Sequence, residues 1–178
     1  DWKSFSEMLR ATPPGNNDSM MFPWFEPEIT PNVRTPGVRR VGLAAGDAAR
    51  NVRAVVEAQM MALANHSRWM AVEVDVIHAT GGAAVNTDIL QVMADVFDAE
   101  VLRFEVSNSA CLGAALRAYH ADAAVAGNDL SWEEVVRGIV EPVADSTIMP
   151  KQSSVKTYAR LRRRYAKLEP LAISECSD

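Results

Sequence analysis

The stretch that decides the fold is Val76–Val106, VIHATGGAAVNTDILQVMADVFDAEVLRFEV. It reads as a short apolar strand, a turn around two adjacent glycines, an amphipathic helix and a second apolar strand, because the spacing of apolar residues changes from two to about 3.6 and back again. Two strands joined by such a helix lie parallel in one sheet, with a right-handed crossover. The stretch therefore predicts an α/β fold.

The paired glycines Gly81 and Gly82 lie at the junction of strand and helix. Ligands of parallel sheets bind outside the carboxyl ends of the strands, and a residue without a Cβ lets a ligand approach the backbone closely. The backbone N–H groups at the N-terminus of the helix favour an anion or a polar heterocycle. Asn86 follows Gly82 by about one helical turn, so its side-chain amide is expected to reach the same ligand. The stretch holds neither a G-x-G-x-x-G fingerprint nor a P-loop. Two interpretations stay open at this point: a nucleotide or phosphate site, or a plain turn.

Apolar spacing and capping residues predict the elements outside this stretch. Residues 1–41 contain most of the prolines and are expected to be irregular, with apolar surface to bury from Phe22, Trp24, Phe25 and Ile29. We expect a helix from Ala48 to about Met70 and a strand over 72–79. The next helix is expected to be capped by Thr87 or Asp88, with a buried stripe of Ile89, Met93, Val96 and Phe97. A strand over 102–106, helices from Asn108 or Ser109 and from Ser131, whose capping box uses Glu134, and a final helix over 155–168 are expected to follow.

Composition excludes several classes of function. The 178 residues are enough for one domain or a large part of one, and 48% apolar with 23% charged residues is typical of a globular protein. A net charge of −5 argues against a nucleic-acid partner, and no apolar run approaches the roughly 20 residues of a membrane span. The basic run RLRRRY, residues 160–165, is expected to be a solvated helix face rather than a recognition patch.

The cysteines and histidines indicate neither a disulfide framework nor a metal site. Cys111 lies in an alanine-rich helical pattern and is expected to be a small buried group, while Cys176 lies near the end of the sequence. The start of the sequence shows no signal-peptide pattern, so a cytoplasmic location is expected. The three histidines are scattered without the spacing of a metal site.

Several spaced motifs together resemble the C-terminal domain of the FGGY carbohydrate kinases. They are a strand ending in T-G-G, an Asn, a Q-x-x-A-D helix, a second strand and an L-G-A-A helix, as in ATGGAAVNTDILQVMADVFDAEVLRFE and NSACLGAALRAYHA. Within the family, EITP, VRAVVEAQMMA and ILQVMADVFDAEV are most similar to D-xylulose kinases. Many members carry Glu where Asn108 stands, and xylulose-kinase-like members accept Asn there. The resemblance covers about Trp2 to His120, with a looser match through the final helix.

The resemblance implies a ribonuclease-H-like fold of the actin, Hsp70 and sugar kinase superfamily, in which two domains close on ATP. Gly81 and Gly82 match the adenosine-motif glycines, and Asn86 matches the Asn that bonds the adenine side. Trp2 resembles an aromatic residue that lies against adenine, and its alternative role is a core anchor.

The resemblance also implies what lies outside this chain. Residues 1–178 match the rear part of the nucleotide-binding domain without its first strands, so the catalytic Asp, the phosphate loops and the sugar-binding domain are expected upstream. Asp75, Asp88 and Asp95 are expected to lie on an exposed strand or on the surface of a helix, and none is expected to act as the base. Mg²⁺ is expected on the nucleotide phosphates rather than on this chain.

The expected partners are therefore ATP or ADP and a sugar held by the upstream domain, while a homodimer stays open. The expected reaction is ATP-dependent phosphorylation of a ketopentose, D-xylulose to D-xylulose 5-phosphate. The alternatives are a kinase for ribulose or glycerol, or a non-catalytic nucleotide-binding module.

Overall fold

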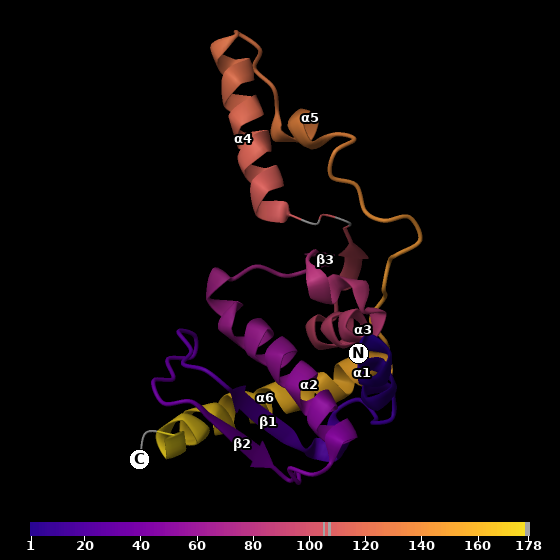
Figure 1. The fold of residues 1–178 in the computed structure, drawn as a ribbon, viewed down its shortest axis with the longest axis vertical. Coiled ribbons are helices and arrows are strands. Elements are labelled where there is room, and N and C mark those ends of the chain that lie inside the picture. Colours follow the sequence, from indigo (N-terminus) through magenta and orange to yellow (C-terminus); the bar gives the residue numbers. More distant parts are fainter. Residues whose placement is uncertain (105, 107, 177–178) are drawn as a thin grey trace.

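The computed structural model of the chain describes residues 1–104, 106 and 108–176. Its elements fold into a body of helices and two small sheets, from which a pair of helices projects (Figure 1). In order they are α1 Trp2–Arg10, η1 Asn16–Asp18, β1 Met20–Trp24, β2 Gly37–Val41, α2 Ala48–His66, η2 Arg68–Met70, β3 Val76–Ala79, η3 Gly82–Val85, α3 Thr87–Phe97, β4 Glu100–Arg103, α4 Ser109–Val125, α5 Trp132–Val136 and α6 Gln152–Cys176, with η marking single 3₁₀ turns.

The predicted strand–helix–strand unit is confirmed. Strands β3 and β4 pair in parallel, with Val76 opposite Glu100 and Ala79 opposite Arg103, and α3 connects them. Leu90 of α3 packs with Ala79 on one face of this pair, in a small core of its own. The helix begins at Thr87, but its N-cap is the preceding residue, so the prediction of a Thr87 or Asp88 cap is wrong.

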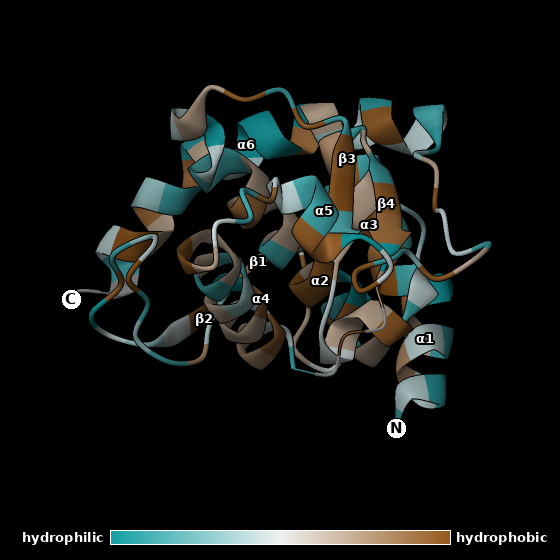
Figure 2. Cartoon of the chain, turned by 90° about the horizontal axis from the view of Figure 1, so that it is seen from above, coloured by the Kyte–Doolittle hydropathy of each residue, from teal (hydrophilic) through white to brown (hydrophobic). Residues whose placement is uncertain are grey.

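The opposite face of the β3–β4 pair is open in the described structure. Successive strand residues point to opposite faces, so Ile77 and Ala79 meet α3 while Val76 and His78 point away from it. Val76 is 44% exposed, and the ring of His78 lies 4.6 Å from that of Phe104. Figure 2 shows the apolar colouring that these two strands carry. A face of this kind packs against another layer in a folded domain.

Residues 1–41 contain helix α1 and strands β1 and β2, so the expectation of an irregular segment is wrong. Strands β1 and β2 pair antiparallel, from Met20 opposite Val41 to Trp24 opposite Gly37. Pro23 is tolerated in β1 because both strands of a two-stranded sheet are edges. As predicted, Trp24 and its neighbour Phe22 are buried, but the equally apolar side chains of Phe25 and Ile29 are exposed.

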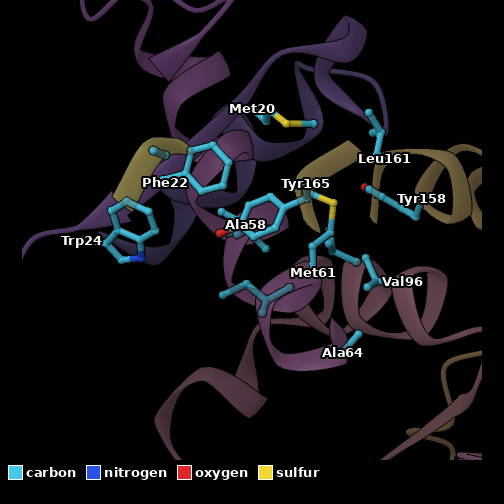
Figure 3. Packing of buried hydrophobic residues seen from close by; sticks show 14 of the residues in the cluster. Met20, Phe22, Trp24, Ala58, Met61, Ala64, Val96, Tyr158, Leu161 and Tyr165 are labelled. Carbon is cyan, nitrogen blue, oxygen red and sulfur yellow. The ribbon is translucent and has the colours of Figure 1, made fainter. Parts of the chain in front are cut away.

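The main core lies between β1, α2 and α6 (Figure 3). Phe22 is fully buried, and its ring centroid lies 4.6 Å from that of Tyr165 in α6. Tyr158 of α6 is buried too, as the helical spacing of the final segment predicts. Helix α6 is longer at both ends than the predicted 155–168.

The basic run in α6 is only partly a solvated face. Arg162 is half-buried and donates to the carbonyls of Val96, at 3.2 Å, and Ala64, at 3.3 Å. Its partial burial lowers the pKa of its guanidinium. Arg164 donates to the carbonyl of Asp18 at 2.6 Å, while Arg160 binds the carboxylate of the same residue. The run therefore ties α6 to α2, α3 and η1.

Helices α4 and α5 form a pair that projects from the body (Figure 1). The predicted Asn108 cap and the Ser131 capping box are both present. The two helices meet where the rings of His120 and Trp132 stack with centroids 4.4 Å apart. Cys111 is exposed on α4, so the prediction of a buried thiol is wrong, because no second layer covers that helix in the described structure. Among the described residues, no helix is long and apolar enough to cross a bilayer.

Candidate functional site

The chain turns sharply where β3 ends. Gly81 has φ +86° and ψ −175°, a conformation that only glycine adopts readily, and Gly82 opens η3. A Cβ built on either glycine would have no described heavy atom within 4 Å, apart from those of its chain neighbours. The backbone of the two glycines is therefore accessible in the described structure.

A hollow of about 480 Å³ adjoins the paired glycines at the carboxyl ends of β3 and β4. We name it the glycine hollow, and it is lined by Gly81, Gly82, Ala84, Val85, Arg103, Phe104 and Val106. Its volume is in the range of small-molecule sites, and its lining is mostly apolar with one cationic side chain. This chemistry suits a flat heterocycle beside an anionic group.

Asn86 is buried, and both ends of its amide are in use. Its Oδ1 accepts from the backbone N–H groups of Asp88 and Ile89, each at 3.1 Å, which makes it the N-cap of α3. Its Nδ2 donates to the hydroxyl of Ser6 in α1 at 2.9 Å. The family resemblance predicts that Asn86 binds a ligand, whereas the structure shows it as a helix cap and as a bridge to α1. Asn is among the preferred N-cap residues, so the capping role had a sequence signal.

Trp2 lies in the first turn of α1 and is 51% exposed, which does not fit the alternative of a core anchor. Its ring meets Phe5 edge-on, with centroids 5.6 Å apart. It borders a second hollow of about 350 Å³, which we name the Trp2 hollow and which is lined by Trp2, Lys3, Ser6, Arg10, Val85, Asn86, Thr87 and Asp88. The exposed indole is suited to stacking on a planar ring.

The four residues predicted to bind a nucleotide lie around η3 but not in one hollow. Gly81 and Gly82 line the glycine hollow, whereas Trp2 and Asn86 line the Trp2 hollow. Val85, which is 60% exposed, borders both. A ligand that contacts all four residues has to pass over this side chain.

Sequence reasoning missed Ser6, the partner of Asn86, and the helix that carries it. The signals were present: Asp1 caps α1 by accepting from the Ser4 backbone N–H at 2.8 Å, and Phe5 and Leu9 recur on one face.

The three carboxylates considered as bases are otherwise occupied or distant. Asp88 pairs with Arg10 at 3.3 Å, and Asp75 is exposed ahead of β3. Asp95 is 2% exposed, which corrects the expectation of a strand or helix-surface position, and it accepts from the backbone N–H of Lys151 at 2.7 Å. Within the described part of the chain, no group of three His, Cys, Asp or Glu side chains could hold a metal ion.

Residues 1–121 match the model of the FGGY family of carbohydrate kinases, C-terminal domain. The chain belongs to this family. Among FGGY kinases it is similar to the xylulose kinase of Rattus norvegicus, with 39% identity over 98% of this chain and 33% of that protein. The xylulose kinase of Mus musculus is 37% identical over 97% of this chain and 32% of its own length. The chain thus spans about a third of the length of these relatives.

Solved structures of FGGY kinases share the fold. The xylulose kinase of Rhodospirillum rubrum superposes with a TM-score of 0.77 and 22% identity, covering 99% of this chain and 35% of that one. The gluconate kinase of Lactobacillus acidophilus gives the same TM-score at 18% identity, covering 98% of this chain and 35% of its own. Kinases named for different substrates superpose equally well, so the fold does not distinguish between sugars.

Proposed function

We propose that this chain is the C-terminal, nucleotide-binding part of an ATP-dependent kinase that converts D-xylulose to D-xylulose 5-phosphate. The observation that carries the proposal is the 39% identity to a xylulose kinase over 98% of the chain. Because the chain spans about a third of that relative, the activity is proposed for the whole protein, with the catalytic carboxylate and the sugar pocket in its remaining part.

In this proposal the chain holds the adenosine half of ATP. Gly81 and Gly82 offer an open backbone to the nucleotide, Trp2 stacks on the adenine ring, and Asn86 keeps α1 and the start of α3 together beside it. The phosphates carry Mg²⁺ themselves, which supplies charge neutralisation in phosphoryl transfer. The β3–β4 sheet has two strands in the described structure, and in this proposal the other strands of a ribonuclease-H-like sheet lie upstream in the protein and pair at the edge of β3. The uncovered face of β3 and β4 then packs against a further layer of the whole domain.

A sugar panel with the full-length protein tests the proposed function. Sugar-dependent ADP release is measured with D-xylulose, D-ribulose and glycerol, and a no-sugar control gives the background. We expect kcat/KM for D-xylulose to exceed the others by at least about tenfold, since a site built to bond a substrate hydroxyl discriminates strongly. A preference for ribulose or glycerol would reassign the substrate. Nucleotide binding without any sugar-dependent release would identify a non-catalytic nucleotide-binding module instead.

Trp2→Ala is expected to weaken ADP binding about ten- to a hundredfold, because stacking of a base on an aromatic side chain is worth roughly 1–3 kcal/mol. Calorimetry on the full-length protein measures the change. Trp69→Ala is the matched control, since Trp69 is 82% exposed and borders neither hollow. A loss below about twofold with the fold intact would show that Trp2 does not stack on the base.

A further inference from the structure

A buried ionic network lies beneath the site, in neither hollow. Arg53 and Glu57 stand one turn apart on α2 and are 7% and 1% exposed. One carboxylate oxygen, Glu57 Oε1, accepts from Arg53 Nε at 2.7 Å, from the Tyr158 hydroxyl at 2.7 Å and from the Gly15 backbone N–H at 2.8 Å. Burial raises the pKa of the Tyr158 phenol, so the hydroxyl stays protonated and donates a hydrogen bond to Glu57. The carboxylate thus joins α2, α6 and the turn that follows α1.

The same network holds the C-terminal end of α1. Arg53 Nη1 donates to the carbonyl of Leu9 at 3.2 Å, and its Nη2 donates to the hydroxyl oxygen of Tyr158 at 2.9 Å. The last carbonyls of a helix have no partner within the helix, so this contact satisfies one of them. Through Arg53 and Gly15, Glu57 fixes both the end of α1 and the chain that leaves it.

Helix α1 has a second anchor nearer the candidate site. Ser6 accepts from Asn86 at 2.9 Å, and Arg10 pairs with Asp88 at 3.3 Å, so α1 also contacts the start of α3. A helix held at its end and at its middle keeps both its position and its rotation about its axis. Its first turn, with Trp2 and Lys3, is placed at the Trp2 hollow as a result.

We propose that Glu57 is a positioning residue for the nucleotide site, acting through α1 to place Trp2 and Ser6 beside η3. The inference rests on the proposed function, because it assumes that a nucleotide occupies this site. Its physical basis is that a buried network tolerates loss of one member poorly: without the charge of Glu57, the buried Arg53 guanidinium loses its counter-charge, and the hydrogen bonds that Arg53 and the Gly15 N–H donate to this position become weaker. The α1 end they hold is then free to shift.

The test is Glu57→Gln in the full-length protein, a change that keeps the shape of the side chain and removes its charge. We expect the KM for ATP and the Kd for ADP to rise about tenfold, while the KM for the sugar changes by less than about twofold. Hydrogen exchange of the α1 amides, measured without nucleotide, should become faster.

Glu169→Gln is the matched control. Glu169 is also buried, at 7% exposure, and binds His66 at 3.1 Å, but it contacts the far half of α2 rather than α1. It should lower stability to a similar extent and leave ADP affinity and α1 exchange unchanged. If Glu57→Gln does not fold, Tyr158→Phe removes one donor to the carboxylate, and a smaller change in the same two readouts is expected.

A double variant with Ser6→Ala separates positioning from general destabilisation. If Glu57 acts through α1, the losses of ADP affinity in Glu57→Gln and Ser6→Ala should combine to less than their product, because both act on one helix. A folded Glu57→Gln protein with unchanged ADP affinity and unchanged α1 exchange would overturn the inference, and so would an equal loss in Glu169→Gln. Wild-type protein that binds no ADP would instead refute the proposed function, and the inference with it.

Discussion

Purified alone, the 178 residues of this chain are expected to release no ADP in response to D-xylulose, however much ATP is supplied. Phosphoryl transfer needs the sugar hydroxyl, a base and the γ-phosphate with Mg²⁺ held in line. In the described structure Asp88 is paired with Arg10, Asp95 is buried and Asp75 lines neither hollow. The chain also spans about a third of the length of its relatives. Positioning alone accounts for many orders of magnitude in rate, so the expected loss is complete.

Supplying the rest of the protein should reverse that loss. Adding the upstream part as a separate chain, or restoring it by fusion, is expected to recover sugar-dependent ADP release. It should also improve stability, because the open face and edge of β3 gain their neighbours. ADP release by the isolated chain that depends on xylulose and exceeds the no-sugar background would show that the catalytic residues lie within these 178 residues.

Gly82→Val is expected to abolish ADP binding while the fold survives. The site of its Cβ has no described atom within 4 Å other than those of its chain neighbours, so the new side chain enters the glycine hollow rather than the core. There it occupies the surface on which the nucleotide is proposed to lie. A loss of at least about a hundredfold in affinity, or roughly 3 kcal/mol, is expected by calorimetry.

The choice of glycine matters for this experiment. Gly81 has φ +86°, so a side chain there strains the backbone and would confuse misfolding with loss of the site. Gly46→Val is the matched control, because Gly46 also lies in an open turn without a positive φ and is remote in sequence from η3. ADP affinity that is unchanged in Gly82→Val would remove the nucleotide site from this turn.

The features predicted correctly from the sequence are those that local interactions determine. The β3–α3–β4 unit follows from apolar spacing, and the Asn108 cap and the Ser131 box follow from residues three positions apart. The inward face of α6 follows from the spacing of Tyr158 and Tyr165. In each case the residues that determine the feature lie close together in the sequence.

The features that were missed depend on contacts across long stretches of sequence. Asn86 meets Ser6 across 80 positions, and Asp95 is buried because it binds the start of α6, 56 positions away. Pairing of β1 with β2 overrode the usual effect of Pro23, because an edge strand tolerates a missing N–H. Cys111 is exposed because its helix has no covering layer in the described structure. Local pattern carries no information about such partners.

The late position of α6 has a consequence during synthesis on the ribosome. Tyr158 and Tyr165, which complete the same core as Leu9 and Phe22, are made about 150 residues after Leu9. At typical rates of translation this delay is roughly 8–30 s. Over that interval the apolar surfaces of β1 and α2 that α6 covers in the folded chain lack this partner, so we expect chaperones that shield such surfaces to bind the nascent chain.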